Sequence, residues 1–188
     1  MKKVLILMGL ALMAAQPAFA SDHVNPLIQS SFSSITPMNL INWKVGDTAE
    51  YNVSLGSFGI QGKMIKSVTK DEGTALWLRQ DLNLSIQKQV ADALINKADG
   101  KILKIIVDGK EQAIPDDKVE VISQDYGEIT VPAGTFQAIH IIAKTKQISK
   151  LEVWANPRDT VMDGTLKQIA ETSLFPLTME LTSFKRGQ

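Results

Sequence analysis

The sequence predicts a mainly β protein: a strongly curved antiparallel sheet, in the form of a half-barrel or open barrel, with a short N-terminal helix or arm. Three observations support this fold class. From residue 43 onward, apolar and polar residues alternate along short segments, as they do in strands that bury one face. Tight-turn pairs such as Asp99-Gly100 and Asp108-Gly109 separate these segments. The segments are not separated by the long helices that connect parallel strands.

Composition excludes several classes of function. Lys plus Arg total 20 and Asp plus Glu total 20, so the net charge is zero and no nucleic-acid partner is predicted. The chain contains no Cys, which excludes disulfides, thiol catalysis, Cys-based metal sites and lipid attachment to an N-terminal Cys. The only two histidines are His23 and His140, too few for a site built from several imidazoles. No cofactor and no metal site are predicted.

The first 20 residues have the features of a secretory signal peptide. Lys2 and Lys3 precede an apolar run over 4–15, and Ala18-Phe19-Ala20 supplies small residues at the cleavage positions. A run of about 12 apolar residues is too short for a bilayer core, which needs about 20. We therefore expect cleavage after Ala20, no transmembrane segment in the exported chain, and a soluble protein that is periplasmic or secreted.

The exported chain is expected to have an arm and one domain. Residues 21–42 contain Ser and Pro among scattered apolar residues, and Asn25-Pro26 is a plausible start for a short helix over about 26–32. The rest of this segment is expected to be an extended arm that lies on the domain. Residues 43–188 are predicted to form a single antiparallel β domain.

The alternating pattern predicts the first strands at 49–55, 60–69 and 76–86, with turns at 56–59 and 71–73. The segment 87–98 is ambiguous. Val90, Leu94 and Ala98 fit one face of a helix, but the segment lies between two strand signals. We interpret it as a strand because a helix would be the one interruption of a continuous meander.

Later strands are predicted at 101–107, from about 119, and at 136–145, 148–155, 165–171 and 177–184. The turn over 131–135 is assigned from Pro132, which fixes φ, and from Gly134, which can adopt a left-handed conformation. In all, about nine or ten short strands are expected. No repeat of fixed period and no second domain is recognised.

No assembled catalytic set is found in the sequence. Ser67 and Lys70 match the Ser-x-x-Lys pattern of acyl-serine enzymes, but that serine opens a helix and Ser67 is predicted at a strand end. His140, in the middle of a predicted strand, is interpreted as a hydrogen-bonded strand histidine rather than a base. The protein is therefore predicted not to be an enzyme, with a periplasmic hydrolase that uses Ser67 and Lys70, or His140, kept as a less favoured hypothesis.

Several charged residues are expected to be solvated. Asp159 and Asp163-Gly164 follow Asn156-Pro157 and faintly resemble a calcium loop, but two carboxylates are too few for that ion. We interpret this stretch as a solvated turn. The mixed charges of Lys66, Lys70, Asp71 and Glu72 receive the same interpretation.

A ligand-binding role is considered for residues of the apolar strand face. In the strand predicted over 76–86, leucines occupy one face and Trp77 lies on the other. Such a face must be covered by a lid, a second layer or a lipid-like ligand, and the arm over 27–41 is one candidate for the lid. We name Trp77, Leu78 and Trp154 as candidate ligand-binding residues, although buried aromatic residues more often belong to a core.

One set of motifs carries a family resemblance. It comprises the two Asp-Gly-Lys turns, Val131-Pro132-Ala133-Gly134-Thr135-Phe136 and Glu152-Val153-Trp154. Over about residues 43–184 the chain resembles poorly characterised bacterial envelope proteins with this Val-Pro-Ala-Gly-Thr-Phe turn, which are similar to the lipoprotein-carrier group. The resemblance implies a strongly curved antiparallel sheet around a hydrophobic cavity and implies no catalytic residues. Many such relatives are lipoproteins, whereas this chain lacks the Cys for that modification.

We therefore predict a soluble periplasmic binding or carrier protein without enzymatic activity. Its ligand would be an apolar, lipid-like molecule or an envelope component. The alternative is a structural or interaction subunit of a cell-envelope assembly that docks on an envelope protein through the arm over 21–42.

Overall fold

The computed structural model describes residues 43–56, 59–114, 119–145, 148–172 and 176–188. The predicted signal peptide over 1–20 and the predicted arm over 21–42, including its short helix, lie outside the described residues. No helix in the described part of the chain has the length and apolar character that crossing a membrane requires.

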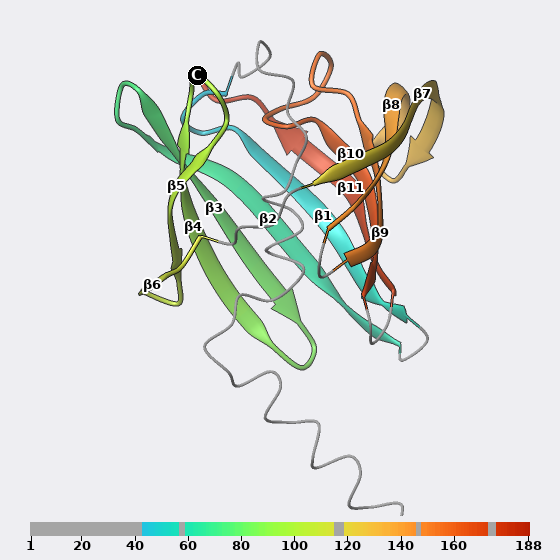
Figure 1. Ribbon diagram of the computed structural model, residues 1–188, viewed down its shortest axis with the longest axis horizontal. Helices are drawn as coiled ribbons and strands as arrows, with labels where there is room; N and C mark the ends of the chain where they lie inside the picture. The colour runs from blue at the N-terminus through green and yellow to red at the C-terminus, as the bar shows by residue number, and fades with distance from the viewer. Residues whose placement is uncertain (1–42, 57–58, 115–118, 146–147, 173–175) are drawn as a thin grey trace, which may run out of the picture.

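One curved antiparallel sheet makes up the described structure, which confirms the predicted fold class (Figure 1). The sheet order is β6-β5-β4-β3-β2-β1-β11-β10-β9-β8-β7. The eleven strands are β1 Thr48–Leu55, β2 Ile60–Asp71, β3 Ala75–Leu84, β4 Lys88–Asn96, β5 Ile102–Val107, β6 Lys110–Gln112, β7 Glu120–Val131, β8 Gly134–Lys144, β9 Ile148–Ala155, β10 Thr165–Thr172 and β11 Pro176–Lys185.

The chain connectivity requires the sheet to curve. Neighbouring strands are consecutive in sequence except at the centre, where β1 pairs with β11. The two edge strands, β6 and β7, are joined by residues 113–119. In a flat sheet of eleven strands, ten steps of about 4.8 Å would separate the edges by about 48 Å. The link can span at most about 29 Å, so the edges must curl toward each other, as Figure 1 shows.

The strand assignments from sequence hold with small differences. The ambiguous segment over 87–98 forms β4, which confirms its interpretation as a strand. The structure contains eleven strands rather than nine or ten because the hairpin at Asp108-Gly109 returns through the three-residue β6. The turn between β7 and β8 consists of Pro132 and Ala133, followed by Gly134 with φ of 141°.

The core covers one face of the sheet. Cross-strand partners share a face, and the row Ala49–Lys66–Gln80–Ala91–Val107 follows one such set of partners across β1 to β5. All five residues are buried. The predicted leucine face of β3 belongs to this core, as shown by its members Leu76, Leu78, Leu82 and Leu84. Apolar burial on this face is therefore the main stabilising contribution.

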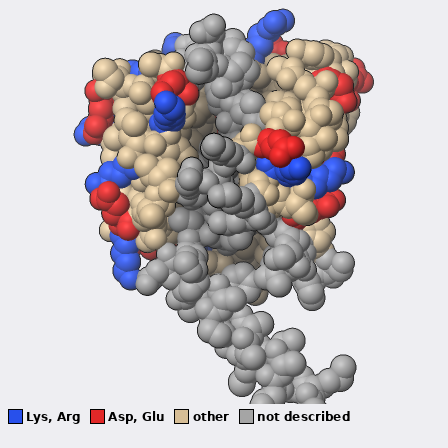
Figure 2. Space-filling view, viewed as in Figure 1, with Lys and Arg blue, Asp and Glu red and all other residues tan. Residues whose placement is uncertain are grey.

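Surface charges are mixed in sign. In Figure 2, acidic and basic side chains lie close together along the outer margins of the visible face. Oppositely charged residues also pair across neighbouring strands, as Arg79 and Asp92 do at 2.8 Å. The visible face therefore presents no large patch of a single sign.

Within the core, Lys66 of β2 forms an ion pair with Asp163 of the β9–β10 loop. The Lys66 Nζ atom lies 3.0 Å from Asp163 Oδ2, and the two side chains are 0% and 4% exposed. Lys66 Nζ also lies 5.4 Å from the centre of the Tyr51 ring, a cation–π contact. The prediction that Lys66 and Asp163 are solvated is wrong. Alternation along β2 places Lys66 on the same buried face as Met64 and Val68. Its counter-ion, Asp163, comes from a loop far away in sequence, and only the tertiary structure brings the two together.

Tyr51 shares this buried polar group. Its hydroxyl donates a hydrogen bond to the Thr165 carbonyl oxygen at 3.2 Å. Burial, together with the nearby Asp163 carboxylate, raises the pKa of the Tyr51 phenol well above its ordinary value of 10.0. The phenol is thus held protonated in the folded protein.

Breaking the buried pair should destabilise the fold. Lys66→Met leaves the Asp163 carboxylate buried without its cation, so we expect the free energy of unfolding to fall by about 3–5 kcal/mol. Adding Asp163→Asn to Lys66→Met removes the buried carboxylate charge and should restore part of the lost free energy of unfolding. Lys63→Met, on the exposed side of β2, is the matched control, with an expected change within about 0.5 kcal/mol. Denaturant unfolding measures all three; a loss below about 1 kcal/mol for Lys66→Met would match a surface pair and contradict this account.

The raised pKa of Tyr51 predicts a loss of stability in alkali. The pKa of Tyr51 is higher in the folded protein than in the unfolded chain. The protonated phenol therefore contributes fully to stability below about pH 10, and this contribution is lost as the pH rises through the folded-state pKa. The chain has two tyrosines, so in a Tyr126→Phe variant only Tyr51 produces tyrosinate absorbance. We expect that signal to appear together with loss of the circular dichroism of the sheet. Tyrosinate formation in a protein that keeps its sheet signal would show that Tyr51 is accessible when folded.

Candidate functional site

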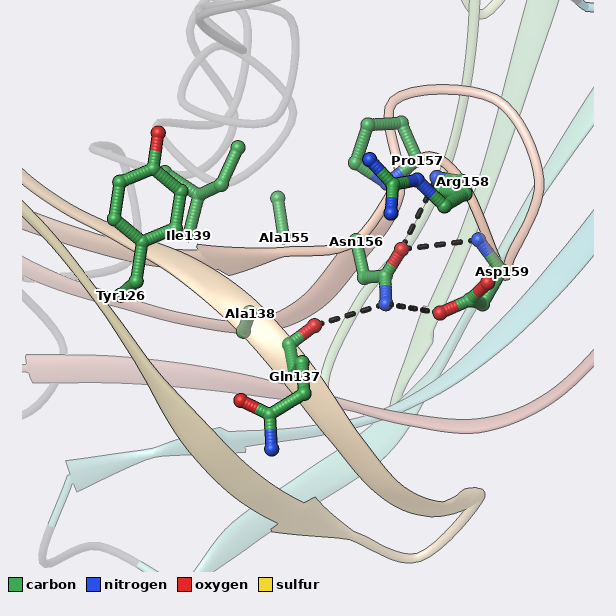
Figure 3. A pocket seen from close by; sticks show the side chains of 9 residues that line it. All are labelled: Tyr126, Gln137, Ala138, Ile139, Ala155, Asn156, Pro157, Arg158 and Asp159. Carbon is green, nitrogen blue, oxygen red and sulfur yellow. Dashed lines mark hydrogen bonds between the residues drawn. The ribbon is translucent and has the colours of Figure 1, made fainter.

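A pocket of about 250 Å³ opens beside β7, β8 and β9 (Figure 3). Its floor comes from Tyr126, Ile139 and Ala155, which are successive cross-strand partners and so share one face of the sheet. Figure 3 shows these three side chains pointing in the same direction. The rest of the lining comes from Gln137, Ala138 and the loop residues 156–159.

Asn156 attaches the rim loop to the sheet. Its side-chain Nδ2 donates to the Gln137 carbonyl oxygen at 2.8 Å and to Asp159 Oδ2 at 2.7 Å. Its Oδ1 accepts from the backbone N–H groups of Arg158, at 3.1 Å, and Asp159, at 2.9 Å. These bonds, drawn in Figure 3, use both donors and both acceptor positions of a buried amide. The amide thereby fixes the conformation of residues 156–159.

The far end of the same loop is held against the core. Asp163 reaches Lys66, and the Thr160 carbonyl oxygen accepts a hydrogen bond of 2.6 Å from Arg186. Met162 has φ of 54°, a conformation that residues other than Gly rarely adopt. At Gly164, with φ of 72°, an added Cβ would lie 2.2 Å from the Pro157 nitrogen. The loop over 156–164 is thus closely packed, with residues 160–164 buried and Arg158 and Asp159 exposed, so the expectation of a solvated turn is wrong for Asp163.

The rim of the pocket carries one unpaired positive charge. The Arg158 side chain is exposed and forms no ion pair with another described residue. The neighbouring Asp159 carboxylate is engaged by Asn156. At the opposite side the Tyr126 hydroxyl accepts a hydrogen bond from Gln124 at 3.3 Å. The pocket therefore combines an apolar floor with a guanidinium able to bind an anionic group.

His140 lies on the other face of the same strands. It is the cross-strand partner of Asp125, which precedes Tyr126 and so faces away from the pocket. The His140 ring stacks on Trp154 at 4.3 Å between ring centres, with 7° between the planes. Its Nδ1 is 3.2 Å from an Asp125 oxygen and its Nε2 is 3.3 Å from a Glu152 oxygen.

A carboxylate thus faces each ring nitrogen of His140, so neither nitrogen is directed at a hydroxyl nucleophile. The Lys150 ammonium, at 2.5 Å, lowers the pKa of Glu152, and His140 lowers it further. This arrangement fits the interpretation of His140 as a hydrogen-bonded strand histidine. On the same face, the Glu152 carboxylate contacts both the Lys150 ammonium and the His140 ring.

The other candidate catalytic residues are separated from this group. Lys70 is exposed and pairs with Glu72 at 2.8 Å, and Ser67 lies half-buried within β2. Among the described residues, no group of three His, Asp or Glu could hold a metal ion. The pocket itself is lined by neither Ser nor His.

The three residues named from sequence as ligand-binding candidates do not lie together. Trp77 is half-buried and its indole N–H donates to Glu72 at 3.0 Å. Leu78, its neighbour on β3, points to the opposite face and is 2% exposed in the core. Trp154 stacks on His140, and none of the three lines the pocket. Their role in ligand binding remains a prediction.

Sequence reasoning missed the pocket for a definable reason. Asn156-Pro157 was recognised only as a turn, and Tyr126 lies on a strand with no particular motif. The floor depends on the register that brings Tyr126, Ile139 and Ala155 side by side. Alternation along the strand indicates that Ile139 shares a face with Ile141 and Ala143. It does not indicate that Ile139 lies opposite Ala155 of the neighbouring strand.

Comparisons with protein-family models and with curated proteins find no match. Solved structures with a similar arrangement include a hypothetical protein from Chlamydia trachomatis (13% identity, TM-score 0.49, covering 78% of this chain and 90% of that chain). A beta-barrel-like protein of a domain of unknown function from Brucella abortus has 10% identity and a TM-score of 0.47, covering 78% of this chain and 99% of that chain. A third is the Pseudomonas aeruginosa MucA/MucB complex, with 12% identity and a TM-score of 0.46; the match covers 85% of this chain and 57% of that chain. The function must be inferred from this chain's own residues.

Removing the Asn156 amide should loosen the rim of the pocket. Asn156→Ala leaves the Gln137 carbonyl and two loop N–H groups without their partner, so we expect the free energy of unfolding to fall by about 2–3 kcal/mol. The backbone amides of residues 158–160 should also exchange faster with solvent deuterium. Asn83→Ala, at an exposed position of β3, is the control and should change neither quantity. Unchanged exchange in the loop would mean that Asn156 does not fix its conformation.

Proposed function

We propose that this protein is a non-enzymatic binding protein of the bacterial cell envelope that takes up the apolar part of an amphipathic ligand. The observation that carries the proposal is the half-open pocket beside β7–β9, with its apolar floor. The predicted signal peptide supports the compartment. The curved sheet supports it too, because a sheet that does not close leaves its mouth accessible to a ligand.

The pocket suits part of a molecule rather than a large molecule in its entirety. Its volume of about 250 Å³ is below the roughly 300–1,000 Å³ typical of sites that enclose drug-sized ligands. The floor of Tyr126, Ile139 and Ala155 would contact the end of an acyl chain or a comparable apolar group. Hydrophobic contact on this floor would supply most of the affinity.

The charge at the rim selects among apolar ligands. Arg158 stands at the rim without an ion-pair partner among the described residues, so it is available for a carboxylate or phosphate. A neutral hydrocarbon would gain nothing from this residue. The expected ligand is therefore an acidic amphiphile, such as a fatty acid or an anionic lipid.

Binding should depend on both the floor and the rim. With dodecanoic acid as the probe, we expect Ala155→Leu, which enlarges a floor side chain and narrows the pocket, to weaken binding at least about tenfold, equivalent to about 1.4 kcal/mol. Arg158→Glu should weaken it to a similar extent, whereas Arg158→Lys keeps the charge and should retain most of the affinity. Isothermal titration calorimetry measures the dissociation constants, and thermal unfolding checks that each variant is folded.

Native mass spectrometry tests the proposal with natural ligands. After incubation with a cell-envelope lipid extract, the protein should carry acidic lipids, and Ala155→Leu should carry fewer of them. Recovery of the bare polypeptide alone would contradict the proposed function. Equal lipid occupancy in Ala155→Leu and the parent protein would exclude this pocket as the site.

A further inference from the structure

The two edges of the sheet differ in how well they are protected against pairing with another strand. One edge, β6, is three residues long and carries Lys110 and Glu111. Short, charged edge strands resist association. The other edge, β7, runs over twelve residues and contains neither Lys, Arg nor Pro. Only its first part is irregular, with a bulge between Val121 and Ser123.

The β7 strand offers an unusually accessible edge. Residues 120–128 are exposed on both faces of the strand, and the β7–β8 hairpin stands out at one side of the molecule in Figure 1. Large apolar side chains are among them: Val121 is 49% exposed, Ile122 is 56% and Tyr126 is 75%. Exposed apolar side chains on a long edge strand are the features that natural edge strands usually avoid. Their presence here indicates an interaction surface.

On its outer side, the backbone of β7 has N–H and C=O groups that pair with no described strand. It pairs with β8 in unbroken register from Ser123↔Ile142 to Val131↔Gly134, and no described strand lies on its other side. In such an edge strand, every second residue directs its N–H and C=O groups away from the sheet. An added strand could therefore pair with up to about nine residues of regular edge.

The side chains of β7 define the partner. On the face shared with His140 the strand presents Asp125 and Glu120, which are 65% and 67% exposed. On the other face it presents Val121, Tyr126 and the exposed Glu128, the partners of Ala143, Ile139 and Gln137. Since β7 has no basic residue, pairing with a second copy would bring two acidic strands together, which is unfavourable. Carboxylates therefore lie on both faces of β7, and a complementary strand would carry basic as well as apolar side chains.

We propose that the outer edge of β7 binds an extended segment of another protein by strand addition, and that this segment combines basic and apolar residues. Backbone hydrogen bonds to β7 supply affinity, and the basic and apolar side chains supply specificity. The proposal goes beyond ligand uptake in the pocket and stands whether or not the pocket binds a lipid, because it depends on the strand edge alone.

Synthetic peptides can test the proposal directly. The probe is a nine-residue peptide of alternating lysine and valine, matched to the regular register of β7. We expect it to bind and to protect alternate amides of residues 123–131 from hydrogen exchange. A peptide in which glutamate replaces lysine, and a lysine–valine peptide methylated at alternate backbone nitrogens, should each bind at least about tenfold more weakly.

Variants localise the interaction. Ile122→Lys places a protective charge on the edge strand and should weaken binding of the lysine–valine peptide at least about tenfold. Leu103→Lys adds the same charge at a comparably exposed position of β5, 48% exposed, and should leave binding within about twofold. Ala155→Leu, which narrows the pocket, should also leave peptide binding unchanged, so this result separates the two proposals.

Several outcomes would overturn the proposal. They are absence of binding up to about 1 mM peptide, equal binding of the methylated or glutamate peptide, and protection confined to strands other than β7. Sedimentation of the protein alone supplies a further check. A dimer that Ile122→Lys converts to a monomer would show that a second copy, not a basic segment, occupies this edge.

Discussion

The short link between the two edge strands constrains the whole molecule. Residues 113–119 connect β6 with β7, which stand at opposite ends of an eleven-stranded sheet. A link of that length cannot cross a flat sheet of this width, so the strands must curl until their edges approach one another. The β1–β11 pairing at the centre then joins the first and last strands of the meander. The curvature of the sheet follows from this arrangement, and no described strand pairs with the outer edge of β6 or of β7.

A curved sheet of this kind must fill its interior, and the β9–β10 loop contributes to that filling with polar as well as apolar groups. Lys66 and Asp163 form an ion pair inside the core, and Tyr51 contacts both the cation and the backbone that follows the loop. An unpaired charge at this depth would be costly, so the pair ties the loop to β2. The same loop begins at Asn156, whose amide fixes the rim of the pocket. The candidate site and the core are therefore connected through one stretch of chain.

The β7–β8 hairpin has different side chains on its two faces. One face carries Asp125 and His140, with His140 stacked on Trp154, and the other carries the floor of the pocket. No strand of the described part of the chain pairs with the outer edge of β7. In this sheet, the body is stabilised by apolar burial, and the groups suited to binding gather at the edge hairpin β7–β8. Exposed residues of this hairpin, such as Tyr126, can therefore change without loss of the core.

The sequence by itself determined the antiparallel meander, because apolar alternation with a period of two and Asp-Gly turns are local properties of the chain. It also placed Leu78 on an apolar face of β3, and it identified the turn at Pro132 and Gly134. Register, loop conformation and the central β1–β11 pairing depend on residues far apart in sequence, and only the tertiary structure decided them. Lys66 and Asp163 illustrate the reason: each is an ordinary polar residue in its own segment, and their burial became favourable only when the fold brought them within 3.0 Å. The pocket likewise required three strands to align Tyr126, Ile139 and Ala155, which no single segment encodes.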